Sequence, residues 1–183
     1  MQEGVLSASE ALERLKEGNQ IYLNASTPSG DISPETRLST SQYGQRPYAI
    51  IVSCSDSRVI PECVFSAGIG ELFVVRVAGN VIDKHQLGSI EYAAEHLGCN
   101  LVVVLGHTLC GAVGAAAKKN TGYIGYITDE IMRAIGEERD CVKASILNVK
   151  HGVAKIKKLL KLKDLQVTGA LYHTESGIVD FDL

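Results

Sequence analysis

Three short apolar segments in the middle of the chain have the pattern of buried β-strands. Residues 48–53 (YAIIVS), 71–77 (ELFVVRV) and 100–105 (NLVVVL) are rich in valine and isoleucine, and their hydrophobicity is continuous rather than alternating. Continuous hydrophobicity is typical of strands that are covered on both faces, as in a parallel sheet. We therefore predict three central strands in these segments.

The segments around these strands have the apolar spacing of amphipathic helices. Residues 7–23 form the first one, in which Ser7 and Glu10 make a capping box. Further helices are predicted at residues 87–97, 112–119, 128–136 and 142–162. In the longest of them apolar residues recur at spacings of three and four, so one face is predicted to be core and the lysines to be solvated.

The end of the chain reads as a hairpin, because residues 166–172 and 178–181 are strand-like and flank a turn at 175–177. Strands that alternate with helices predict an α/β fold, with a mostly parallel central sheet flanked by helices and an antiparallel edge from the hairpin. No linker or internal repeat divides the sequence. We expect a single domain over residues 1–183, with an N-terminal helix and arm at 1–45 and an α/β core at 46–183.

Residues 24–45 form a long polar connection that includes two prolines and two glycines, with one helical turn at most. A connection of this length in a compact domain is either a functional loop or an arm that lies on a partner subunit. We favour the arm, since little of the chain is nearby to cover it or the helix before it. A homodimer or homotetramer is therefore expected.

The composition excludes several classes of protein. The chain has 183 residues, of which 45% are apolar and 21% charged, as in ordinary globular proteins. Its net charge of −3 gives no basic surface, so no nucleic acid partner is expected. No segment approaches the roughly 18 consecutive apolar residues of a membrane span, and the first residues lack a signal-peptide pattern. We expect a cytoplasmic protein with no membrane partner.

The cysteines need an explanation other than disulfide bonds. Their number is odd and the expected compartment is reducing, so burial or metal ligation must account for them. We predict that Cys63 and Cys99 are core residues and that Cys141 opens the long helix. The five cysteines are Cys54, Cys63, Cys99, Cys110 and Cys141.

The other two cysteines belong to segments that directly follow predicted strands. Cys54-x-Asp56-x-Arg58 follows the first strand, and His107-x-x-Cys110 follows the third. The carboxyl ends of strands in an open α/β sheet are where ligands bind, so adjacent strands could bring the two segments together. Two thiolates and one imidazole suit zinc and leave one tetrahedral position open. Each residue alone could be an ordinary buried side chain, but the combination favours a metal site.

These paired motifs resemble the signature of the β-class carbonic anhydrases. The similarity covers most of the chain, including residues 17–19, Arg76 with 78–80, 88–93 and the C-terminal hairpin. The resemblance implies one zinc ion per subunit, held by Cys54, His107 and Cys110. It also implies a pocket that is lined partly by a partner subunit.

The resemblance further implies roles for four residues near the metal. Asp56 would accept a hydrogen bond from the zinc-bound hydroxide and Arg58 would hold Asp56, although Asp56 can instead become a fourth zinc ligand in a closed state. Gln45 matches a substrate-contacting amide of the family, and a surface loop position explains it equally well. The backbone N–H of Gly111 would point at a substrate oxygen.

The implied activity is that of a lyase, the reversible hydration of carbon dioxide to bicarbonate and a proton by attack of zinc-bound hydroxide. We expect the rate to rise with pH through the neutral-to-basic range. Two alternatives stay open: a hydrolase of carbonyl sulfide or carbon disulfide on the same scaffold, and a non-catalytic zinc-binding or thiol-sensing protein. The Asp56–Arg58 pair argues against the second, because such a site has no need to orient hydroxide.

Overall fold

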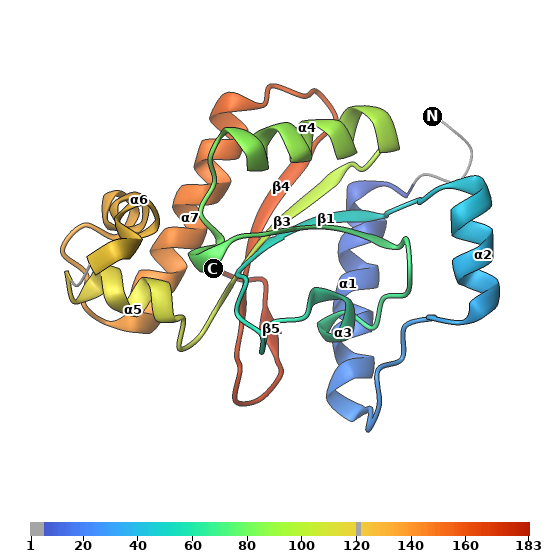
Figure 1. Cartoon of the computed structure of the whole chain (residues 1–183), viewed down its shortest axis with the longest axis horizontal. Helices are drawn as coiled ribbons and strands as arrows, with labels where there is room; N and C mark the ends of the chain where they lie inside the picture. Colours follow the sequence, from blue (N-terminus) through green and yellow to red (C-terminus); the bar gives the residue numbers. More distant parts are fainter. Residues whose placement is uncertain (1–5, 120–121) are drawn as a thin grey trace.

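Five strands form one sheet, in the order β2-β1-β3-β4-β5 (Figure 1). In the computed structural model, which describes residues 6–119 and 122–183, β1 to β4 run parallel and β5 pairs antiparallel with β4. The predicted α/β fold with an antiparallel C-terminal edge is thereby confirmed. The strands are β1 (Ala49–Ser53), β2 (Leu72–Arg76), β3 (Leu101–His107), β4 (Gln166–Tyr172) and β5 (Val179–Asp180).

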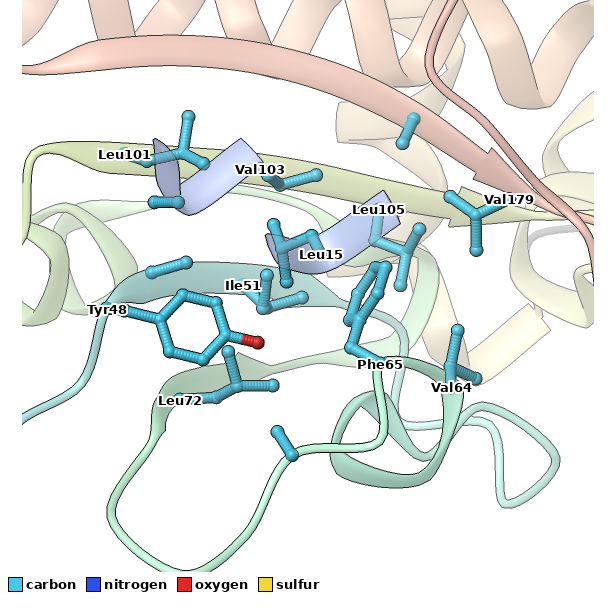
Figure 2. Packing of buried hydrophobic residues seen from close by; sticks show 14 of the residues in the cluster. Leu15, Tyr48, Ile51, Val64, Phe65, Leu72, Leu101, Val103, Leu105 and Val179 are labelled. Atoms are coloured by element: carbon cyan, nitrogen blue, oxygen red, sulfur yellow. The ribbon is translucent and has the colours of Figure 1, made fainter. Parts of the chain in front are cut away.

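Helices cover both faces of this sheet. One face packs against α1 and α3, where Leu15 and Phe65 meet Ile51 and Leu105 (Figure 2). The other face packs against α4 and α7, while α5 and α6 lie together at one end (Figure 1). The helices are α1 (Ala8–Asn24), α2 (Pro34–Tyr43), α3 (Pro61–Val64), α4 (Lys84–Leu97), α5 (Gly111–Ala117), α6 (Gly125–Ile135) and α7 (Cys141–Leu159), with 3₁₀ turns η1 (Ala78–Asn80) and η2 (Gly122–Ile124).

The burial of the strands follows their hydrophobic pattern with one exception. Every residue of β1 and β3 is buried, as continuous hydrophobicity predicts. In β2 only Leu72 is buried, because β2 is the edge strand and the rest of it is half-buried or exposed. No helix in the described part of the chain is long and apolar enough to cross a membrane.

Two differences from the sequence prediction concern the polar connection and the end of β3. The polar connection contains a full helix, α2, rather than one helical turn at most; Ser33 caps it, Pro34 starts it and Gly44 ends it with a φ of 81°. None of its residues is buried, so its sequence lacks the periodic apolar face from which a helix is predicted. Strand β3 ends two residues later than predicted, because His107 still pairs with Tyr172 of β4. His107 is therefore the last residue of a strand, not part of the following loop.

Candidate metal centre

The carboxyl ends of β1 and β3 bring three ligand-type side chains together. Cys54 directly follows β1, His107 ends β3, and Cys110 precedes α5. Their donor atoms lie within 4.8 Å of one another, and all three residues are buried. They meet because β1 and β3 are neighbours in the sheet, which is the arrangement that the sequence predicts.

His107 presents a free nitrogen lone pair to this cluster. Its Nδ1 lies 2.8 Å from the carbonyl oxygen of Thr108, and a carbonyl can only accept, so Nδ1 carries the proton of the neutral ring. Its Nε2 is buried and has no hydrogen-bond partner among the described residues. A buried acceptor without a partner is costly, and a bound metal ion would remove that cost.

The two thiols of Cys54 and Cys110 lose one proton easily, and the remaining proton is shared between them and is hard to remove. A hydrogen bond from Cys110 is the largest cause that lowers the pKa of Cys54 to about 4, and the backbone N–H groups of Gly79 and Asp56 help at 3.2 and 3.4 Å from its Sγ. The same hydrogen bond and burial raise the pKa of Cys110. A second thiolate in this buried place needs a cation beside it, so the donor set fits a divalent metal ion.

The remaining cysteines lie outside the cluster. All five cysteines are free of disulfide bonds. Cys99 is buried, as predicted, whereas Cys63 on α3 is only half-buried. Cys141 is the first residue of α7 and is also half-buried.

Asp56 lies beside the cluster and forms a bidentate ion pair with Arg58. Nε and Nη2 of Arg58 donate to Oδ1 and Oδ2 of Asp56 at 2.9 and 2.7 Å, and the Arg58 backbone N–H donates to Oδ1 at 3.0 Å. The Arg58 side chain is the main reason that the pKa of Asp56 lies well below its usual range. Oδ2 of Asp56 is 4.0 Å from Nε2 of His107, so an ionised carboxylate borders the donor atoms.

The backbone around the cluster is held by contacts that were not predicted. Arg76, the last residue of β2, donates to the carbonyl oxygens of Cys54 at 3.1 Å and of Asp56 at 2.8 Å. Arg58 Nη2 donates to the carbonyl oxygen of Leu109 at 3.1 Å, and Leu109 has a left-handed φ of 56° that turns the chain between His107 and Cys110. Arg76 lies near the end of a predicted strand, but only the pairing of β2 with β1 reveals what it holds.

The two predicted substrate contacts fall in different places. Gly111 is the first residue of α5, and a Cβ there would meet no neighbouring side chain or backbone within 4 Å, so the space beside it is open. Gln45 is exposed, and the next residue, Arg46, pairs with Gly70 before β1 and β2 begin. Gln45 thus lies at the amino ends of the strands, whereas the cluster lies at their carboxyl ends. Within one chain Gln45 is not part of the centre.

Comparisons with known proteins give consistent matches. The sequence model of the carbonic anhydrase family matches residues 49–179, a span that includes all three residues of the cluster. Carbonic anhydrase 2 of Mycobacterium tuberculosis is 46% identical over 128 residues, which cover 67% of this chain. The match spans only 60% of that relative's length.

Solved structures share the fold. The β-carbonic anhydrase CafA of Aspergillus fumigatus superposes with a TM-score of 0.71 at 28% identity, over 94% of this chain and 88% of that one. A carbon disulfide hydrolase in its apo form superposes with a TM-score of 0.60 at 18% identity, over 80% of this chain and 86% of that one. At that identity the second likeness concerns the fold alone.

Proposed function

Because the chain belongs to the carbonic anhydrase family, in its β class, we propose that it catalyses the reversible hydration of carbon dioxide to bicarbonate and a proton. The observation that carries the proposal is the buried cluster of Cys54, His107 and Cys110 with the ionised Asp56 at its border. Family membership and local chemistry support the same reaction independently of each other.

We assign zinc as the metal, one ion per subunit, with Cys54, His107 and Cys110 as its ligands. Two thiolates and one imidazole leave a fourth tetrahedral position open, as in catalytic zinc sites. When bound, zinc lowers the pKa of a water in that position toward about 7, so that hydroxide is available near neutral pH.

Asp56 orients the attacking oxygen. Both of its carboxylate oxygens are held by Arg58, which fixes the carboxylate plane and keeps it ionised. The remaining lone pair of Oδ2 accepts a hydrogen bond from the O–H of the nucleophile. This hydrogen bond directs the lone pair of the nucleophilic oxygen toward the carbon of carbon dioxide. Because Arg58 engages both oxygens, we propose that Asp56 stays off the metal at rest. The N–H of Gly111, beside open space at the start of α5, donates to a substrate oxygen.

Neither alternative function has an observation of its own. The carbon disulfide hydrolase shares the fold at 18% identity, which does not bear on the substrate. A thiol sensor or a purely structural zinc site has no use for a carboxylate that an arginine keeps ionised beside the donor atoms. Carbon dioxide therefore remains the proposed substrate.

We further propose a homodimer or homotetramer in the cytoplasm, in which Gln45 of one copy reaches the centre of another. Helix α2 has no buried residue, and its neighbourhood exposes three large apolar side chains: Ile32, Leu38 and Tyr43. Strand β2 forms one edge of the sheet, and its apolar residues other than Leu72 are only half-buried. A second copy covering these surfaces would remove their exposure.

Removal and return of the metal test the proposed activity. Carbon dioxide hydration is measured on the purified protein, after chelation, and after addition of one equivalent of zinc, with sulfide release from carbonyl sulfide and carbon disulfide followed in parallel. We expect hydration to be lost with the metal and restored by zinc. Sulfide release without hydration would replace the substrate, and neither activity in zinc-loaded protein would favour a non-catalytic role.

A further inference from the structure

The loop between His107 and Cys110 is held from outside by the turn of the C-terminal hairpin. Thr108 is 4% exposed and directly follows His107. Its Oγ1 lies 3.0 Å from the backbone nitrogen of Thr174, 2.9 Å from the Thr174 hydroxyl and 3.0 Å from Oε2 of Glu175. The backbone N–H of Thr108 donates to the carbonyl of Tyr172 at 3.0 Å. Four hydrogen bonds therefore join this one residue to the hairpin.

The direction of each hydrogen bond follows from the groups involved. The Thr174 N–H can only donate, and the Glu175 carboxylate can only accept. The single proton of the Thr108 hydroxyl therefore goes to Glu175, which leaves the Thr174 hydroxyl as donor in the remaining contact. One donor and two acceptor positions of the Thr108 hydroxyl are all used, and Glu175 is the group that receives its proton.

The hairpin turn is itself anchored in the core, so it can act as a fixed support. Asn19 of α1 is 2% exposed. Its Nδ2 donates to the carbonyl of Gly177 at 2.9 Å and its Oδ1 accepts from the N–H of Val179 at 3.0 Å. A third hydrogen bond, from Nδ2 to the carbonyl of Val64 at 3.2 Å, ties the same side chain to α3.

Thr108 is also the residue that orients His107. The carbonyl oxygen of Thr108 accepts the Nδ1 proton of His107 at 2.8 Å, which sets the tautomer and the direction of Nε2. On the other side, Arg58 donates to the carbonyl of Leu109, the next residue. The loop thus lies between Arg58 and Glu175, and a displacement of Thr108 would move the imidazole.

We infer that Glu175, acting through Thr108, is a positioning residue for the metal centre: it fixes the loop that sets Nε2 of His107 and Sγ of Cys110 at their mutual spacing. The inference rests on the proposed function, which gives this spacing its use in holding zinc. Groups that orient metal ligands in this way typically contribute 10- to 100-fold to metal affinity or activity.

Two substitutions of Glu175 separate its hydrogen bond from its charge. Glu175→Ala removes the acceptor, whereas Glu175→Gln keeps an acceptor oxygen and removes only the charge. Asp180→Asn is the matched control, because it neutralises an exposed carboxylate on the same hairpin, and among the described residues this carboxylate accepts a hydrogen bond only from the N–H of Asp182. Each protein is loaded with Co²⁺, whose visible absorption reports ligand geometry, and its Zn²⁺ affinity is measured by competition with a chelator.

We expect Glu175→Ala to change the Co²⁺ spectrum and to weaken Zn²⁺ affinity about tenfold or more. Glu175→Gln and Asp180→Asn should keep the wild-type spectrum and affinity. A wild-type spectrum and affinity in Glu175→Ala would overturn the inference. Equal losses in the Ala and Gln variants would overturn it too, because they would place the effect in the charge.

A second pair of variants guards against misfolding of Glu175→Ala. Thr108→Val keeps the shape of the side chain without its hydroxyl, and Thr108→Ser keeps the hydroxyl. We expect Val to reproduce the loss and Ser to restore the spectrum, and equal behaviour of the two would contradict the inference. Because the spectrum and affinity need no turnover, a wild-type protein that binds Co²⁺ normally but hydrates no carbon dioxide would refute the proposed function and leave this test intact.

Discussion

His107 has one ring nitrogen bonded to a carbonyl oxygen and the other buried beside two sulfur atoms, an asymmetry that suits a metal ligand better than an acid–base group. The sulfur atoms complete the set, and their shared proton must leave when a cation enters. At this scale the sequence was informative, because Cys54, His107 and Cys110 all follow predicted strands. The contact between Thr108 and Glu175 was not predictable, since it depends on the register of β4 against β3.

Removal of one sulfur should abolish metal binding. In Cys110→Ala only Cys54 and His107 remain, and two ligands do not make a stable zinc site. We expect the zinc content to fall from one ion per chain toward zero, measured by elemental analysis after gel filtration. Cys63→Ala, which removes a thiol outside the cluster, should keep its zinc. Full zinc occupancy in Cys110→Ala would contradict the proposed ligand set.

The pH dependence of the rate should not come from Asp56. Its folded pKa is lowered by Arg58, so the ionised form is favoured: the stabilisation is present above the unfolded pKa of about 3.9 and is lost only as the pH falls toward the folded value. Asp56 is therefore ionised throughout the neutral and basic range. We therefore assign a rise of the rate with pH in that range to the water at the metal.

Arg58→Gln tests this assignment. Without its partner the pKa of Asp56 returns toward its ordinary value, which still lies below the neutral range. We expect a lower plateau of kcat, because the carboxylate is less well oriented, but an unchanged midpoint of the pH–rate profile. A midpoint that moves by a full unit or more, or a flat wild-type profile in zinc-loaded protein, would contradict the assignment.

Elements meet in this fold where small residues allow close approach. Helix α7 reaches the sheet through Val149, whose methyl groups lie only 2.5 Å from where a Cβ on Gly106 of β3 or on Gly169 of β4 would be. The apolar spacing of α7 and the strands of the sheet were predicted correctly, yet the pattern gave no sign of this contact. It gave no sign of α2 either, because a wholly exposed helix has no apolar face.

Gly169→Ala should destabilise the protein by about 1–3 kcal/mol, because the new methyl group overlaps the stiff side chain of Val149. The free energy of unfolding is measured in urea. When Val149 is already replaced by alanine, Gly169→Ala should lower the free energy of unfolding by less than it does in the wild type. Gly88→Ala, in the exposed part of α4 with open space beside it, should be neutral or slightly stabilising. If the effects of Gly169→Ala and Val149→Ala on the free energy of unfolding are additive, the contact between the two residues is excluded.

At the scale of the whole molecule, one predicted contact, between Gln45 and the metal centre, does not form within a single chain. Gln45 lies at the amino ends of the strands and the cluster at their carboxyl ends, so only a second copy can bring them together. The sequence predicted an arm but could not say what it covers, because its residues are polar and a partner's surface leaves no periodic pattern. The exposed apolar side chains near α2 are the physical reason to expect association.

Light scattering tests the association directly. We expect a mass of two or four times the chain's 19.6 kDa. Leu38→Glu, on the exposed surface of α2, should shift the protein toward the monomer while leaving its circular dichroism unchanged, and Glu35→Gln on the same helix serves as the control. A wild-type monomer would remove the basis for a role of Gln45.

In the proposed reaction, this chain hydrates carbon dioxide with a metal-activated water that Asp56 orients. Stopped-flow hydration on zinc-quantified wild-type protein beside Asp56→Ala, near neutral and at alkaline pH, tests it most directly. We expect fast hydration by the wild type, faster at the alkaline pH, and a loss of about a hundredfold in Asp56→Ala with zinc still bound. No hydration at either pH by wild-type protein with one zinc per chain would contradict it.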